Sequence, residues 1–422
     1  MGRTARNRST PNVKPVEKIE LSEKNVGLRL VLIAILLMIG AGALAYGVNA
    51  LFTVESGWHE IQADSGAELN NANEFVFMYE LGVGEKSATV EKKALTSLYT
   101  DAVVNAYRLF ASGEEFENVN NLSYINRHPN EVITVDPALY HAFEIIQNAH
   151  NRAIYMAPVY RQYDDIFTCS DDSQLIDFDP YRSEEVAFYY KEIAAYANDV
   201  EAINLELLGD SQIRLYVSSD YLKYAEENYI TDFIDFFWMK NAFIVDYLAD
   251  TLIEKGYTSG TISSFDGFTR NLDTRQTSYS LSVYDYVDGR AYQAASMEYN
   301  GARSIVYLRN YMMNSPDTQY YYQMENGQTR TPYLDVRDGL CKSAIDSLYA
   351  YSTEISCGEI LMQVMPIYIA DTLDTTKIKG LSEQNVYFVY CEDQTIYYNE
   401  SGLKLTYLFD HGSLKYKKVY TG

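Results

Sequence analysis

The feature that most constrains this chain is a continuous apolar run over residues 30–52, in which Asn49 is the one strongly polar side chain. As a helix this run would extend about 34 Å, at about 1.5 Å per residue, which is enough to cross a hydrocarbon core with some tilt. The preceding residues 1–29 carry seven basic and three acidic side chains. Because a basic flank is retained in the cytoplasm, we expect a transmembrane helix at residues 30–52, a cytoplasmic basic tail at residues 1–29, and the rest of the chain outside.

A cleaved signal peptide is the alternative interpretation of the same run. Val48-Asn49-Ala50 is a loose small-residue cleavage site, but the run is longer than the roughly 7–15 residues of a signal-peptide core. The length therefore favours an anchor that is not removed. The polar residues 53–73 are then a tether, and residues 74–422 make up one extracytoplasmic domain.

The charge of the chain is unevenly distributed. The net charge is −24, and residues 1–29 contribute +4, so the remainder carries −28. An acidic domain repels nucleic acid phosphates, and no basic stripe interleaved with aromatic side chains offsets this repulsion. The sequence therefore argues against nucleic acid as a partner.

All four cysteines follow the apolar run, on the side expected to be exported. They show no C-x-x-C spacing, and the five histidines lack the spacing of metal ligands, which argues against a zinc site. Four cysteines can pair in three ways, and the sequence does not choose among them. We expect free or incidentally paired cysteines at positions Cys169, Cys341, Cys357 and Cys391.

Helical periodicity and strand-like alternation mark single helices and strands along the domain. Asp136 before Pro137 is a favourable helix start, because aspartate caps a helix and proline suits its first turn. Asp266-Gly267 is a strong turn signal between two strands. We expect strands at residues 75–81, 203–208, 213–217, 386–390 and 396–398, and helices at residues 91–112, 138–149, 183–202 and 247–255.

A loop between Asp235 and Asp246 carries a resemblance to a known family. It reads D-F-F-W-M-K-N-A-F-I-V-D and resembles the D-L-G-G-I-A-K-G-Y-A-V-D pattern of the ApbE-like FAD:protein FMN transferases. The aspartates keep their separation, but Phe237 and Trp238 stand where the family has Gly-Gly, and Asn241 stands where it has lysine. A glycine pair lets the backbone adopt a positive φ without steric cost and approach a pyrophosphate. We expect neither aromatic residue to do so.

Further blocks follow the family's order and spacing. Residues 125–127 match its L-N-R stretch. Asp335 and Arg337 match its H-H-I-I-D-P-R-T-G stretch, in which Thr331 and Pro332 have replaced the two histidines. The resemblance covers most of the exported domain. It implies an α+β fold, a T-fold-related domain of mixed helices and antiparallel sheet behind the transmembrane helix.

The resemblance also implies a chemistry. Enzymes of this family use Mg²⁺ to cleave the FAD pyrophosphate and pass FMN to a serine or threonine of an acceptor protein. Mg²⁺ prefers hard oxygen ligands, and the family supplies two of them from an aspartate and a threonine four residues apart on one helix. Glu359 and Gln363 stand there in this chain and are candidate Mg²⁺ ligands. The alternative is two polar residues at a helix start or on its surface.

The positions that the resemblance assigns to flavin binding have largely changed in chemistry. Asp246 early in a helix and the Asp266-Gly267 turn are also explained by structure alone, through the helix dipole and the turn. Asp335 and Arg337 are expected to form an ion pair that shapes their loop. The implied cofactor-binding positions are Asp235, Phe237, Trp238, Asp246, Asp266, Asp335 and Arg337, and no catalytic residue is assigned.

We therefore expect a membrane-anchored, extracytoplasmic flavin-transferase-like protein that has lost catalysis and acts as a binding or scaffold module. Its expected partners are exported redox proteins or an active relative. The alternative is a divergent but active Mg²⁺-dependent FAD:protein FMN transferase that attaches FMN to Ser or Thr of exported redox proteins. A third possibility is a protein that retains flavin without catalysis.

Overall fold

The computed structural model of this protein describes residues 26–67 and 71–422. Residues 1–25 of the predicted cytoplasmic tail, residues 1–29, lie outside the described residues. So do residues 68–70 of the predicted tether. The chain divides into two compact units, Met1–Val54 and Glu55–Gly422.

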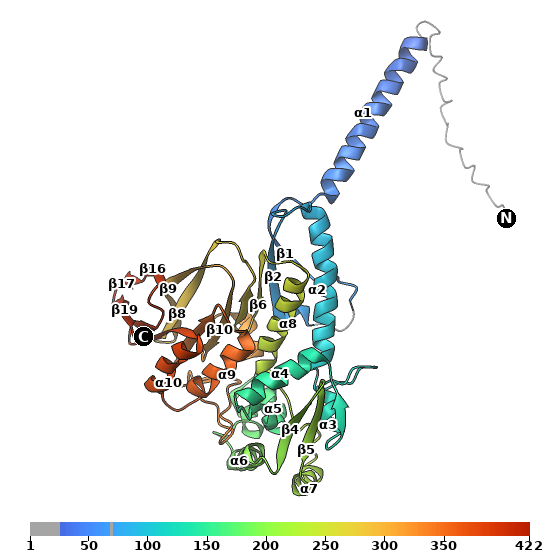
Figure 1. Ribbon diagram of the computed structural model, residues 1–422. Coiled ribbons are helices and arrows are strands. Elements are labelled where there is room, and N and C mark those ends of the chain that lie inside the picture. Colours follow the sequence, from blue (N-terminus) through green and yellow to red (C-terminus); the bar gives the residue numbers. More distant parts are fainter. Residues whose placement is uncertain (1–25, 68–70) are drawn as a thin grey trace, which may run out of the picture. The chain divides into compact units, whose positions relative to one another are not determined.

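The first unit contains the helix α1 (Val26–Phe52), which includes the whole apolar run (Figure 1). Its side chains are described mainly for residues 30–44, and these are exposed. Within the described part of the chain, no helix is both long and apolar enough to cross a membrane. The transmembrane segment and the signal-peptide alternative therefore stay predictions.

The second unit is built on a nine-stranded sheet with the order β1-β2-β6-β7-β10-β13-β14-β15-β19. Neighbouring strands are antiparallel except for the last pair, β15 and β19, which is parallel. The predicted α+β class is confirmed. The strands are β1 (Gly57–Glu60), β2 (Phe75–Leu81), β6 (Gly260–Ser264), β7 (Phe268–Asn271), β10 (Arg303–Arg309), β13 (Ser347–Ser352), β14 (Tyr387–Glu392), β15 (Thr395–Tyr398) and β19 (Lys417–Tyr420).

Both faces of this sheet are covered at its centre, where every residue of β13 is buried. Successive side chains of a strand point to opposite faces. Ile305, Tyr349 and Val389 pack against a smaller sheet, β16-β9-β8, while α8 and α9 contact the sheet and α2 lies beside α8 (Figure 1). These elements are α2 (Ala88–Phe110), α8 (Lys240–Glu254), α9 (Cys357–Tyr368), β8 (Ser278–Val287), β9 (Arg290–Asn300) and β16 (Lys404–Leu408).

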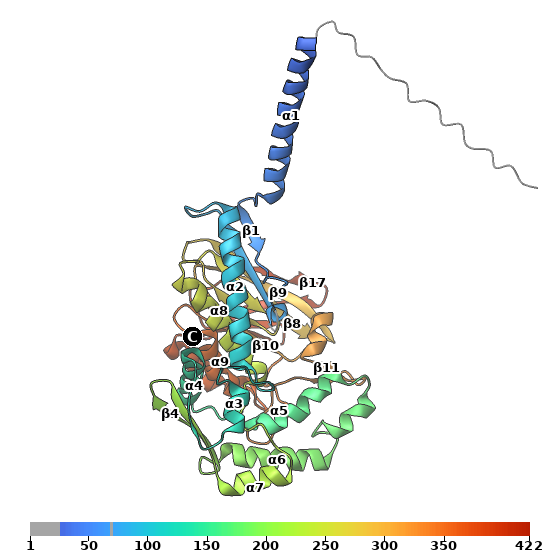
Figure 2. The same ribbon diagram turned by 90° about the vertical axis from the view of Figure 1, so that its right-hand side faces the viewer.

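The chain between α2 and α8 forms a group of short elements at the lower end of this unit in both views (Figures 1 and 2). As predicted, Pro137 begins α4 and the Asp136 carboxylate accepts the N–H of Ala138 at 2.8 Å. The helix predicted for residues 183–202 ends at Asn198, because Asp199 adopts an extended conformation. The elements are α3 (Leu122–Arg127), β3 (Val132–Thr134), α4 (Pro137–Asn148), α5 (Ala157–Tyr163), α6 (Glu184–Asn198), β4 (Ile203–Gly209), β5 (Gln212–Val217) and α7 (Ser219–Glu227).

The segment between Asp235 and Asp246 is largely helical, although we expected a loop followed by a helix at residues 247–255. A 3₁₀ turn, η5, leads directly into α8, which begins at Lys240. Because this segment contains no glycine, α8 extends further towards the N-terminus than we expected. The remaining short elements are α10 (Thr375–Gly380), β11 (Tyr322–Gln323), β12 (Thr329–Arg330), β17 (Asp410–His411), β18 (Leu414–Lys415), η1 (Ala72–Glu74), η2 (Ala153–Met156), η3 (Asp164–Thr168), η4 (Asp172–Asp177), η5 (Phe237–Met239), η6 (Ser315–Gln319) and η7 (Leu381–Gln384).

Candidate functional site

A cavity of about 440 Å³ lies where α2 ends and η5 and α8 begin. Its wall also includes the turn between β6 and β7, η3, the end of η6, and Tyr320. Four of the predicted flavin-binding residues line it, namely Asp235, Phe237, Trp238 and Asp266. Its carboxylates are Glu74, Glu114, Asp164, Asp235 and Asp266, its aromatic side chains are Tyr107, Phe110, Phe167, Phe237, Trp238 and Tyr320, and Lys240 is its basic residue.

Asp235 lies just before the helical segment and contacts its first residue. Its carboxylate accepts the backbone N–H of Phe237 at 2.8 Å and the hydroxyl of Ser112 at 2.7 Å. Burial raises the pKa of Asp235, and these two hydrogen bonds oppose that shift. The positive end of the helix therefore already has an anionic partner within the chain.

Phe237 has a φ of +49°, so it adopts the left-handed conformation that we expected only a glycine to adopt without steric cost. Its ring stacks on Tyr160 with the ring centroids 4.7 Å apart. Trp238 is 8% exposed and meets Tyr333 edge to face at 4.8 Å. Phe237 thus has a backbone conformation that glycine adopts easily, and the rings of Phe237 and Trp238 fill the space beside it.

Glu74, Asn241 and Asp266 form a polar cluster in the wall of the cavity. The amide Nδ2 of Asn241 donates to Glu74 Oε2 at 2.9 Å and to Asp266 Oδ2 at 3.0 Å. Asn241 Oδ1 and Asp266 Oδ1 are buried and have no hydrogen-bond partner among the described residues. Burial raises the pKa of Asp266 to about 6, and the Glu74 charge contributes to the shift.

The sequence does not mark Glu74 as a site residue, because Glu74 directly precedes a strand and carries no motif. Asn241 was recognised as a replacement for lysine, but its two carboxylate partners lie 167 and 25 residues away along the chain. Its role follows from tertiary structure alone. Asp266 occupies the predicted turn, with Gly267 at a φ of +112°.

Asp246 does not line this cavity. We expected the dipole of its own helix to stabilise the carboxylate, but the structure gives it other partners. It lies inside α8, and its carboxylate accepts the N–H groups of Cys357 at 2.9 Å and Gly358 at 2.7 Å, at the start of α9. Arg270 from β7 donates to it at 2.7 Å. Burial disfavours the Arg270 charge, but the Asp246 carboxylate outweighs this effect and raises the guanidinium pKa. Asp246 thus joins α8, β7 and α9.

Glu359 and Gln363, the candidate Mg²⁺ ligands, do not line this cavity either. Glu359 forms a capping box with Ser356 at the start of α9, in which its carboxylate accepts the Ser356 N–H at 2.8 Å. Gln363 Oε1 is buried and lacks a hydrogen-bond partner within the described part of the chain. Among the described residues, no group of three or more His, Cys, Asp or Glu side chains could hold a metal ion.

Asp335 and Arg337 line a second cavity, of about 530 Å³. They form the expected ion pair, with Arg337 Nη2 at 2.5 Å from Asp335 Oδ2, and Lys342 Nζ lies 3.0 Å from the same oxygen. Although burial opposes its charge, these donors lower the pKa of Asp335. The structure therefore separates these two residues from the first cavity.

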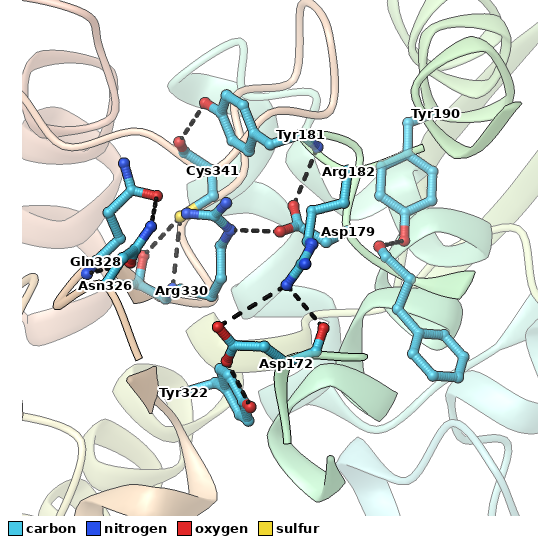
Figure 3. A network of polar contacts seen from close by, with 12 residues as sticks. Asp172, Asp179, Tyr181, Arg182, Tyr190, Tyr322, Asn326, Gln328, Arg330 and Cys341 are labelled. Atoms are coloured by element: carbon cyan, nitrogen blue, oxygen red, sulfur yellow. Dashed lines mark hydrogen bonds and ion pairs between the residues drawn. The ribbon is translucent and has the colours of Figure 1, made fainter. Parts of the chain in front are cut away.

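The loop that carries Thr331 is held by a network of polar contacts (Figure 3), of which the Arg330–Asp179 pair is buried. Arg330 Nε donates to Asp179 Oδ2 at 2.8 Å, and Tyr181 Oη donates to the carbonyl of Cys341 at 2.8 Å. The hydroxyl of Thr331 contacts Cys341 Sγ at 3.2 Å. Thr331 and Pro332, which the resemblance aligns with the family's histidines, are thus a threonine tied to a thiol and a proline in the cavity wall. All four cysteines are free in the part of the chain that the structure describes.

Comparisons with known proteins identify the fold. No family model matches the chain, and no curated protein matches it by sequence. Among solved structures, the ApbE protein of Thermotoga maritima is 10% identical with a TM-score of 0.52, covering 79% of this chain and 93% of its own length. The flavin transferase ApbE of Vibrio cholerae is 12% identical with a TM-score of 0.52, covering 83% of this chain and 97% of its own length. This chain has the ApbE fold.

Proposed function

We propose that this protein is a flavin-transferase-like module that no longer transfers FMN and instead binds a ligand or partner. It is anchored by residues 30–52 with its main domain outside the cytoplasm, where exported redox proteins or an active relative are its expected partners. The observation that carries the proposal is the chemistry of the 440 Å³ cavity, where four of the expected flavin-binding positions meet.

The cavity does not suit the diphosphate of FAD. Five carboxylates line it against one lysine. Three of them, Glu74, Asp235 and Asp266, are buried or half-buried, where like charges repel an anionic ligand most strongly. Asp235 also uses the N–H of Phe237 that starts the helical segment. The half-buried ring of Phe237 lies in the wall, where the family's glycine would leave space.

The residues at the implied Mg²⁺ positions do not fit that role either. The carboxylate of Glu359 is committed to the start of its own helix. Gln363 contributes an amide oxygen, which is a weaker ligand for a hard cation than a carboxylate. Neither side chain lines the cavity in which Asp235 and Asp266 meet.

The test is a flavin-transfer assay on the full-length protein in mild detergent. FAD, Mg²⁺ and an exported redox protein with an acceptor serine or threonine are supplied, and AMP release and protein-bound flavin fluorescence are measured. We expect neither product above the level of a sample without the protein. Sustained AMP release together with a flavinylated acceptor would overturn the proposal.

The buried, unpartnered Oε1 of Gln363 favours the second candidate, a divergent active transferase that uses Glu359 and Gln363. The matched variant is Glu359→Gln, because glutamine keeps the capping box while it removes the charge. Turnover in the native protein that is lost in Glu359→Gln would establish this second candidate. Flavin that co-elutes with the protein in gel filtration, without turnover, would indicate retention of flavin alone.

A further inference from the structure

We propose that the 440 Å³ cavity binds an organic cation, a primary amine with an aromatic or apolar body, whose ammonium group lies against Asp266, Asn241 and Glu74. This inference rests on the proposed role as a binding module and names the ligand class of that module. The observations that carry it are the two unpartnered oxygens, the excess of carboxylates and the aromatic walls.

The two buried oxygens require hydrogen-bond donors. Asp266 is 8% exposed and Asn241 is 2% exposed, and a buried acceptor without a donor destabilises the folded protein. Among the described residues, Lys240 Nζ lies 3.9 Å from Glu74 Oε1, and it leaves Asp266 Oδ1 and Asn241 Oδ1 without a partner. An ammonium group carries three N–H donors and one positive charge, which matches both the missing donors and the excess negative charge.

The remaining wall suits the organic part of such a ligand. Six aromatic side chains line the cavity, and aromatic faces attract cations as well as apolar groups. The volume of about 440 Å³ lies within the roughly 300–1,000 Å³ of small-molecule sites. A bare metal ion would leave most of this apolar surface without a partner, so an amine with an organic body fits better.

Binding is expected to depend on pH because the ammonium group pairs with ionised Asp266. Several other titratable groups face the same cavity. They are Glu74 from η1, Tyr107 on α2, Asp235 before η5, Lys240 at the start of α8, the neutral phenol of Tyr320 after η6, and the exposed Asp164 and Glu114. Asp266 has a pKa of about 6, so it is mostly neutral at pH 5 and mostly charged at pH 7.5. The affinity should therefore rise by about tenfold between these two pH values.

The experiment is isothermal titration of the full-length protein with phenethylamine, with 2-phenylethanol as the neutral analogue. MgCl₂ and CaCl₂ are titrated separately. We expect phenethylamine to bind at least tenfold more tightly than 2-phenylethanol at pH 7.5. Equal affinities, or saturable binding of Mg²⁺ or Ca²⁺ in place of the amine, would overturn the proposal.

Three variants locate the site. Asp266→Asn keeps the shape and removes the charge, and it should weaken phenethylamine binding by at least tenfold. Asn241→Lys supplies an internal ammonium group and should abolish binding. Asp101→Asn makes the same charge change at an exposed position of α2 and should leave the affinity unchanged. An unaltered affinity in both cavity variants would refute the assigned position.

The two proposals fail separately. Amine binding combined with FMN transfer would refute the loss of catalysis and leave the cation site intact. Absence of amine binding combined with absence of transfer would refute the cation site and leave the catalytic loss supported.

Discussion

Phe237 shows how the chain keeps the backbone of a glycine position without the glycine. Its φ of +49° costs a residue with a Cβ roughly 1–2 kcal/mol relative to a right-handed conformation. The stack of its ring on Tyr160 buries apolar area that offsets this cost. The residue therefore combines an unfavourable backbone with a favourable side chain.

This combination gives a test at the residue scale. Phe237→Ala loses the ring and keeps the strained backbone, whereas Phe237→Gly loses the ring and relieves the strain. We expect the glycine variant to be more stable than the alanine variant by about 1 kcal/mol, measured from urea unfolding midpoints. This order is the reverse of the usual one, and an alanine variant of equal or greater stability would contradict the left-handed conformation.

Asp266 gives a second test at this scale. Its pKa of about 6 in the folded protein lies above the roughly 3.9 of an unfolded aspartate. The protonated form is therefore favoured by folding, and this stabilisation is complete below about pH 4 and is lost as pH rises through 6. We expect the free energy of unfolding to fall by roughly 2–3 kcal/mol over this interval.

The measurement is the unfolding midpoint as a function of pH, compared between the native chain and Asp266→Asn. The variant cannot ionise at this position, so the component of the pH dependence due to Asp266 should disappear. Asp101→Asn, at an exposed site, serves as the control and should leave the profile unchanged. Identical profiles for the native chain and Asp266→Asn would show that the carboxyl does not titrate in this range.

At the scale of elements, the contact between α8 and α9 depends on Gly358. A Cβ atom there would lie 2.8 Å from Cε1 of Phe243 and 3.4 Å from the Asp246 carboxylate. Gly358→Ala should therefore destabilise the protein by about 1–3 kcal/mol through overpacking. Gly380→Ala in α10 is the matched control, because a Cβ meets nothing within 4 Å there, and alanine favours a helix. Equal unfolding temperatures for both variants would contradict the close approach.

The sequence predicts elements well where a local signal marks them. Asp136 and Pro137 begin α4 as expected, and Asp266-Gly267 forms the turn between β6 and β7. The predicted start of α8 is wrong. The resemblance implied a loop there, but the segment contains no glycine and continues the helix. Local signals therefore predict helix caps and turns better than they predict how far a helix extends.

The candidate site was only partly predictable. Four of its residues, Asp235, Phe237, Trp238 and Asp266, come from the expected motif positions. Glu74 could not be found, since it has no motif and reaches the site through the pairing of β2 with β6. The separation of Asp335 and Arg337 into a second cavity also depends on tertiary packing, which no spacing along the chain reveals.

At the scale of the whole molecule, the basic tail and the apolar run lead to a prediction of topology. An alkaline phosphatase fusion after Gly422 should be active, because that enzyme folds on the oxidising side of the membrane. A fusion that is inactive there and active in the cytoplasm would contradict the predicted orientation. Carbonate extraction separates the anchor from the signal-peptide alternative, since the anchored chain should stay in the membrane fraction.

The polar network of Figure 3 also determines how late in synthesis this part of the domain can finish folding. Arg330 and Asp179 are 151 residues apart, and Tyr181 and Cys341 are 160 apart. Because the chain is synthesised from its N-terminus, the segment around η4 leaves the ribosome long before the loop with which it pairs. Such distant pairing slows folding and leaves apolar surface exposed in the interval. The pairing at this end of the molecule is thus completed late in synthesis, and a chain truncated before Arg330 should be a substrate for proteases.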